Sequence, residues 1–173
     1  MATVVSLQAC LLRFTIVFGC AALMLSAAWE ANVAALSLPQ RKLGVREIVL
    51  ATVEAWNSHR LDALREFFDE QVTLERPGLE KPLRGRDAYF AFDSDYLAAF
   101  PDATIEVRSI VVERDLAVHE FIMRGHQRGV FRGAPPTGKQ IAIPVVEVLR
   151  FKNNRIAEVR RYLDPSLYDR QLK

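Results

Sequence analysis

The sequence predicts a single α+β domain of the cone-shaped type, in which a curled antiparallel sheet has helices across its mouth. Apolar residues in the first half of the domain recur at three- and four-residue spacing, the period of an amphipathic helix. From residue 104 onward they alternate with period two, the pattern of half-buried strands. No repeat or interdomain linker divides the two regions, and 173 residues lie within the range of one domain. A domain of this architecture encloses a pocket.

Three helices are expected in the first half of the domain. The first covers residues 45–56, and the second is short and covers residues 61–68. A strand at residues 72–75 follows and is stopped by a Pro-Gly pair. The third helix begins at Gly85 and is closed by Pro101. Its apolar stripe is unusually aromatic and consists of Tyr89, Phe92, Tyr96 and Phe100.

Four long strands are expected to follow as an antiparallel meander, at residues 104–113, 116–124, 140–151 and 155–163. The last two can be aligned, because Asn153-Asn154 is a suitable two-residue turn that would pair Lys152 with Arg155. Counting outward puts four pairs on one face: Leu149 with Glu158, Glu147 with Arg160, Val145 with Tyr162, and Ile143 with Asp164. The other face pairs Val148 with Val159, Val146 with Arg161, and Pro144 with Leu163. The first face suits a pocket lining and the second a subunit contact, although the pattern also allows the reverse.

The charge of the chain argues against nucleic-acid binding. There are 23 basic and 21 acidic residues, a net charge of +2, and no long basic tract that could neutralise a row of phosphates.

The first 38 residues carry only Arg13 and Glu30 as charges, and they contain an apolar run from Phe14 to Trp29. This segment, residues 1–38, is predicted to be a cleaved secretory signal, which implies a secreted or periplasmic domain over residues 39–173. Two alternatives stay open: Met24 is the true start of a cytoplasmic protein, or the segment remains as a membrane anchor.

The mature domain is expected to use neither a metal nor another cofactor. Both cysteines, Cys10 and Cys20, lie in the predicted signal, so thiolate nucleophiles and Cys-ligated metals are not expected after cleavage. His59, His119 and His126 do not have the spacing of metal ligands.

A set of spaced residues between Val45 and Leu172 resembles the SnoaL-like polyketide cyclase family, within the superfamily similar to nuclear transport factor 2 and ketosteroid isomerase. The set comprises Phe100-Pro101-Asp102, Gly125-His126, Gly129, Phe131, Gly133, the run 135–139, Arg150-Phe151, Arg155-Ile156, Glu158, Tyr162 and Asp164. The resemblance implies the cone-shaped fold. It is less specific for activity, because the same cone hosts cyclases, isomerases, epoxide hydrolases and non-catalytic modules.

The resemblance implies a catalytic role for Asp164, which matches the aspartate that serves these cyclases as general acid and base in an intramolecular aldol closure. An apolar pocket would raise the pKa of this carboxyl group toward neutral pH. The alternative is a structural role, because an aspartate before a proline commonly starts a helix.

His126 matches the family's Gly-His motif and is a candidate to polarise a carbonyl group or shuttle a proton; its alternative is a backbone hydrogen bond at a strand end. Glu147 is the candidate second carboxylate, and an ion pair with Arg160 across the strands is its alternative. Arg160 is also a candidate to orient an anionic oxygen. The remaining candidate substrate-binding residues are aromatic and are more often core: Tyr162, Trp56, Tyr89, Phe92 and Tyr96.

The sequence therefore favours a cofactor-independent cyclase or isomerase that acts on a small apolar, carbonyl-bearing molecule. A non-catalytic module that binds a ligand or a partner is the main alternative. Epoxide hydrolysis by Asp164, Glu147 and Arg160 is the third. A homodimer is expected on the aliphatic sheet face, which consists of Val146, Val148, Val159 and Leu163.

Overall fold

Helices and strands follow one another in the predicted order in the part of the chain that the computed structural model describes, residues 43–173. The predicted signal lies outside the described residues, and the boundary at residue 38 stays a prediction. No helix within residues 43–173 is long and apolar enough to cross a membrane. The helices are α2 (Val45–Asn57), α3 (Leu61–Arg65), α4 (Arg86–Ala99) and α5 (Ser166–Leu172). The strands are β1 (Phe68–Glu75), β2 (Leu83–Arg84), β3 (Thr104–Glu113), β4 (Leu116–His126), β5 (Gln140–Lys152) and β6 (Arg155–Tyr162).

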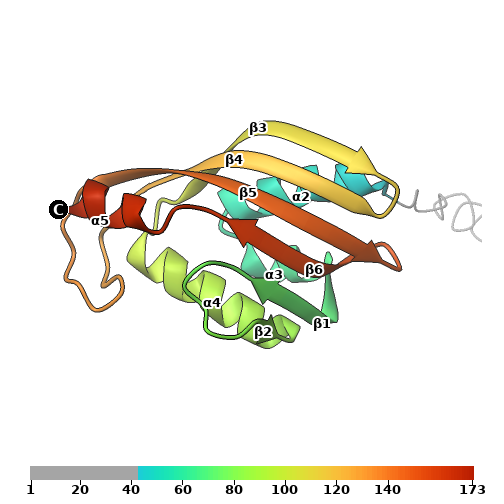
Figure 1. Cartoon of the computed structure of the whole chain (residues 1–173), viewed down its shortest axis with the longest axis horizontal. Helices are drawn as coiled ribbons and strands as arrows, with labels where there is room; N and C mark the ends of the chain where they lie inside the picture. The colour runs from blue at the N-terminus through green and yellow to red at the C-terminus, as the bar shows by residue number, and fades with distance from the viewer. Residues whose placement is uncertain (1–42) are drawn as a thin grey trace, which may run out of the picture. The chain divides into compact units, whose positions relative to one another are not determined.

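The six strands form one curled sheet in the order β2-β1-β6-β5-β4-β3. Neighbouring strands are antiparallel except β1 and β6, which pair in parallel. The helices α2, α3 and α4 gather on one side of the sheet (Figure 1). This arrangement confirms the predicted α+β fold with a curled sheet, although the sequence pattern indicated neither the parallel pair nor β2. The second helix was predicted to extend to Phe68, but it ends at Arg65 and Phe68 begins β1.

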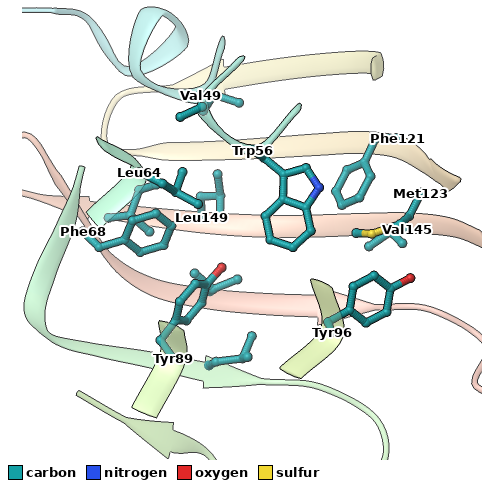
Figure 2. Close-up of a cluster of buried hydrophobic side chains, with 14 of the residues drawn as sticks. Val49, Trp56, Leu64, Phe68, Tyr89, Tyr96, Phe121, Met123, Val145 and Leu149 are labelled. Carbon is teal, nitrogen blue, oxygen red and sulfur yellow. The ribbon is translucent and has the colours of Figure 1, made fainter. Parts of the chain in front are cut away.

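The core lies between this helical layer and the inner face of the sheet. Trp56, from α2, lies between Phe121 and Met123 of β4 and the α4 residues Tyr89 and Tyr96 (Figure 2). All five side chains are buried. Three residues of the predicted aromatic stripe, Tyr89, Tyr96 and Phe100, are therefore buried in the interior, whereas Phe92 is half-buried.

The β5–β6 hairpin begins in the predicted register and then departs from it. Asn153 and Asn154 have φ angles of 50° and 65°, as a two-residue hairpin turn of this type requires, and Lys152 pairs with Arg155. The register shifts one pair further on, because Ala157 is an extra residue in β6. Such a bulge turns every later side chain of the strand to the opposite face.

The predicted pairs beyond the bulge are therefore wrong. Glu147 lies opposite Arg161 rather than Arg160, and Val146 rather than Val145 lies opposite Tyr162. Val159 is fully buried in the core, whereas Val146 of the same predicted aliphatic face is 36% exposed. The four residues of the predicted dimer contact do not share one exposed face, so that surface assignment is incorrect. A homodimer itself stays a prediction.

The segment between β4 and β5 packs on the C-terminal end of α4 through its backbone. The amide groups of Arg128 and Gly129 both donate to the carbonyl oxygen of Ala99, at 2.9 and 3.0 Å. A Cβ atom on Gly129 would stand 2.1 Å from the carbonyl oxygen of Ala98, so only glycine permits this approach. Gln127 is fully buried and binds the segment internally, accepting a hydrogen bond from Thr137 at 2.8 Å. Much of the glycine-containing motif thus has a structural role.

Candidate active site

A small cavity of about 40 Å³ lies between the helices and the inner face of the sheet. This interior cavity has an apolar wall from the core and a polar wall of side chains that the fold buries almost completely. The polar side chains are Asp93 on α4, His119 on β4, and Glu147 and Arg161 on β5 and β6, with Trp56 and Tyr89 beside them. Burial of four ionisable groups at one place is unusual for a core and marks it as a candidate site.

Arg161 is the centre of this polar wall. Its Nε donates to Oε1 of Glu147 at 2.6 Å, and an NH group donates to the hydroxyl of Tyr89 at 3.2 Å. Asp93 lies further away, with Oδ1 3.7 Å from the second guanidinium nitrogen. One buried arginine therefore stands between two carboxyl groups, and its closer partner is Glu147.

The pKa of the buried Asp93 differs from that of an exposed aspartate. Burial raises its pKa from 3.8 to about 6, and the positive charge of Arg161 offsets part of that rise. Near pH 7 the group is mostly ionised, yet it takes up a proton more readily than ordinary carboxyl groups do. This is the property of a general acid and base that works near neutral pH.

His119 stands beside Glu147, with its Nδ1 atom 4.0 Å from Oε2, and its ring packs against Phe121 at 4.6 Å between centroids. Burial lowers the pKa of the imidazole, and the charge of Glu147 offsets part of this decrease. The ring is therefore neutral at pH 7, with one nitrogen able to donate and one able to accept a proton.

Three buried polar atoms of residues lining the cavity lack a hydrogen-bond partner: Nε1 of Trp56, Nε2 of His119 and Oδ1 of Asp93. An unpaired buried polar atom costs about 1–3 kcal/mol. A water molecule or a polar group of a bound molecule in the cavity could pair with these three atoms.

The structure places Asp164, the predicted catalyst, outside the cavity. Its side chain is 52% exposed and accepts hydrogen bonds from the amide and the hydroxyl of Ser166 at 2.9 and 2.7 Å. These bonds from Ser166, with a further one from Arg170, lower the pKa of the carboxyl group. The predicted placement and the predicted rise in pKa are both incorrect, because Asp164 follows the bulged strand and binds the first turn of α5 instead.

His126, Arg160 and Tyr162 also lie away from the cavity. The backbone amide and Nδ1 of His126 both bind the Asp102 carboxylate at 2.7 Å, in a half-exposed position at the end of β4. Arg160 pairs with Glu158 on the outer face at 3.2 Å, and Tyr162 is 52% exposed. The bulge at Ala157 explains the last two positions.

The cavity does contain three of the predicted residues: Glu147, Trp56 and Tyr89. Phe92 and Tyr96 line a different, larger pocket. The catalytic and binding roles of all these residues stay predictions.

Three cavity residues, Asp93, His119 and Arg161, were not predicted as site residues. Asp93 follows Tyr89 by four residues and precedes Tyr96 by three, so helical spacing alone puts a carboxylate on the aromatic stripe. A charged residue on an apolar helical stripe is thus a sequence signal that could have identified Asp93 as a site residue. Within residues 43–173, no group of three or more His, Cys, Asp or Glu side chains has an arrangement that could hold a metal ion.

We expect the contribution of Asp93 to the stability of the domain to be lost as the pH rises from about 4 to about 6, while His119, with its lowered pKa, contributes in the opposite direction. The folded pKa of Asp93 lies above the unfolded value of 3.8. Its contribution is therefore fully present below 3.8 and is lost as the pH rises through about 6. The difference amounts to on the order of 3 kcal/mol. Urea denaturation of the unchanged protein and of Asp93→Asn at several pH values measures this contribution as the difference between the two stability profiles. Two profiles of the same shape would contradict the assignment.

The chain has the cone-shaped α+β fold, and its interior contains a small cavity lined by buried polar side chains. The family model of the SnoaL-like polyketide cyclases matches residues 46–172, and the chain belongs to this family. No curated protein sequence matches the chain.

Solved structures similar to this chain include two from Streptomyces. IdmH, a proposed polyketide cyclase of Streptomyces antibioticus, is 28% identical with a TM-score of 0.66, over 73% of this chain and 96% of its own. AclR, a proposed hydroxylase of Streptomyces galilaeus, is 25% identical with a TM-score of 0.65, over 73% of this chain and 79% of its own. A proposed SnoaL-like polyketide cyclase of Jannaschia sp. CCS1 shares the fold, at 23% identity and a TM-score of 0.68, over 73% of this chain and 89% of its own.

Proposed function

We propose that the protein is a cofactor-independent enzyme of the cyclase or isomerase type, which moves a proton between carbon and oxygen of a small apolar carbonyl compound. The observation that carries this proposal is the set of unpaired atoms at the interior cavity, on Trp56, His119 and Asp93. Membership of the SnoaL-like family supports the reaction type.

Asp93 is the proposed base. Its raised pKa, and an Oδ1 atom that lies 3.7 Å from Arg161 but accepts no hydrogen bond, allow the carboxylate to take a proton from the carbon next to a carbonyl group. The electron pair of the broken C–H bond forms the enolate double bond, and the carbonyl oxygen gains the negative charge. In a cyclisation the enolate carbon attacks a second carbonyl carbon of the same molecule, and the new alkoxide takes the proton back from Asp93.

Trp56 and His119 are the proposed stabilisers of the enolate oxygen. The indole N–H donates only, and a neutral imidazole can present an N–H at Nε2. Fixed donors in a buried place stabilise a developing charge more strongly than water does. The guanidinium of Arg161, which is held by Glu147, adds a positive potential without having to move.

The size of the cavity limits what it can hold. About 40 Å³ is the room for little more than one water molecule, so side chains have to shift for a substrate to reach Asp93. The apolar wall favours a compound whose reacting part is flat and aromatic or alicyclic.

Proton exchange in D₂O tests the proposal without knowledge of the natural substrate. We expect the α-protons of simple aryl ketones, with 1-tetralone as the first probe, to be replaced by deuterium at a rate proportional to protein concentration. Proton NMR measures the loss of the α-CH₂ signal. The buffer alone is the control. Exchange at the buffer rate across a panel of aryl and alicyclic ketones would contradict the proposal.

Epoxide hydrolysis is a second candidate, which the position of Arg161 among Glu147 and Asp93 favours. A water molecule fits the cavity. Glu147 can take a proton from this water while Asp93, in its protonated form, gives a proton to the epoxide oxygen. Formation of a diol from styrene oxide, with one oxygen atom from labelled water, would favour this reaction over ketone exchange.

A further inference from the structure

A second and larger pocket, of about 500 Å³, opens beside α4. We call it the arginine pocket, and its walls combine two arginines with aromatic and aliphatic side chains. Its lining includes Arg76, Arg132, Phe92, Tyr96, Phe131 and Asp95. Its volume is that of a typical site for a small organic molecule.

Both guanidinium groups lie over aromatic rings. Arg76 is 5.1 Å from the centroid of Phe92, and Arg132 is 5.0 Å from the centroids of both Phe131 and Tyr168. Such contacts hold the planar groups in place at the pocket wall. The two arginines come from segments far apart in the sequence, the turn after β1 and the β4–β5 segment.

Neither arginine forms an ion pair with a carboxylate among residues 43–173. The one side-chain hydrogen bond of Arg76 goes from Nε to the carbonyl oxygen of Pro77 at 3.3 Å, and that of Arg132 goes to Pro165 at 3.4 Å. Each guanidinium has five N–H groups, so most of these donors have no hydrogen-bond partner in the described part of the chain. Other arginines on this domain, such as Arg150 and Arg170, do have carboxylate partners.

The charges around Arg76 also favour an anion in this pocket. Burial lowers the pKa of Arg76, and repulsion from Arg161 and Arg132 lowers it further. An anion in the pocket would relieve this repulsion. Asp95 also lines the pocket and contributes one negative charge, but its carboxylate is not within ion-pair distance of either arginine.

From this geometry we infer that the arginine pocket binds a flat organic carboxylate, with the ring between the aromatic side chains and the carboxylate on Arg76 and Arg132. The fork of N–H groups of an arginine matches the two oxygens of a carboxylate. Phe92, Tyr96 and Phe131 provide apolar faces for a ring. This site is separate from the interior cavity, and its occupation does not depend on the proposed reaction.

Binding of 2-naphthoate to the full chain tests the inference, with methyl 2-naphthoate as the neutral probe of the same shape. We expect isothermal titration to show at least tenfold tighter binding of the acid than of the ester. Amide signals of Val130, Phe131 and Arg132 should shift on titration in ¹⁵N NMR spectra. Equal affinity for acid and ester, or shifts confined to other parts of the domain, would overturn it.

Charge variants locate the site. Arg132 is exposed, so Arg132→Met keeps the alkyl contact with the rings and should not affect folding, yet it should weaken naphthoate binding about tenfold. Arg76→Met should do the same, whereas Asp95→Asn should strengthen binding because it removes a repulsive charge. Arg155→Met, an exposed arginine at the β5–β6 turn, is the matched control and should bind like the unchanged protein. A loss in the control equal to that of Arg132→Met would refute the site. Turnover is not used, so ketone exchange and naphthoate binding can fail independently.

Discussion

Replacement of Arg161 by methionine is expected to lower the free energy of unfolding by about 3–5 kcal/mol at pH 8. The side chain is 10% exposed and binds Glu147 at 2.6 Å, so its removal leaves that carboxylate buried without its cation. Asp93 loses the same positive charge, which would raise its pKa further. Methionine fills much of the volume, so the loss reports the missing charge rather than a cavity. Urea denaturation followed by circular dichroism measures it.

Arg160→Met is the matched control for this substitution. Arg160 is the neighbour of Arg161 and pairs with Glu158 on the outer face, where both side chains are about one third exposed. A solvent-accessible ion pair contributes about 0–1 kcal/mol. The double variant Arg161→Met with Glu147→Leu should recover part of the lost stability, because no unpaired Glu147 remains. Equal losses of unfolding free energy for Arg160→Met and Arg161→Met would show that the buried ion pair of Arg161 contributes no more stability than the pair on the outer face.

Substitution of Asp93 by asparagine is expected to reduce the rate of ketone exchange about 100-fold or more. Asparagine keeps the shape of the side chain and cannot take up the α-proton, and a positioned acid or base contributes about this factor. The ketone exchange assay measures the rate, and a cooperative unfolding transition of the variant at the same pH would show that the fold persists.

Asp164→Asn distinguishes the two carboxyl groups and is the control for Asp93→Asn. Asp164 is exposed and binds Ser166 and Arg170, so its amide variant should exchange the ketone at nearly the unchanged rate. Asparagine serves about as well as aspartate at a helix start, so stability should change little. If instead Asp164→Asn abolished exchange and Asp93→Asn did not, the role implied by the family resemblance would hold and the interior assignment would fail.

The glycine-containing motif that indicated the family also has a physical explanation in the fold. Gly129 permits the backbone contact with α4, and Gln127 organises the segment up to Lys139. His126 closes the same end of β4 through Asp102. Phe131 then packs against Phe100 at 4.9 Å between centroids. A motif can therefore be specific for a fold while its residues remain outside the cavity.

Local patterns in the sequence determined the helices, the long strands, the Asn153-Asn154 turn and the family. Period and turn chemistry act within a few residues, so they can be recognised without the rest of the chain. Glu147, Trp56 and Tyr89, which the same patterns gave as candidates for the pocket, line the interior cavity.

The tertiary structure alone decided which ionisable groups meet in that interior. One extra residue at Ala157 exchanges the faces of β6, so Arg161 enters the cavity in place of Arg160, and Tyr162 and Asp164 remain outside. Alternation with period two carries no sign of such a bulge, because the pattern on either side of it is regular. Asp93 on α4 and His119 on β4 approach Arg161 only through packing of the helices on the sheet. That packing depends on contacts between residues distant in sequence, which no local pattern contains.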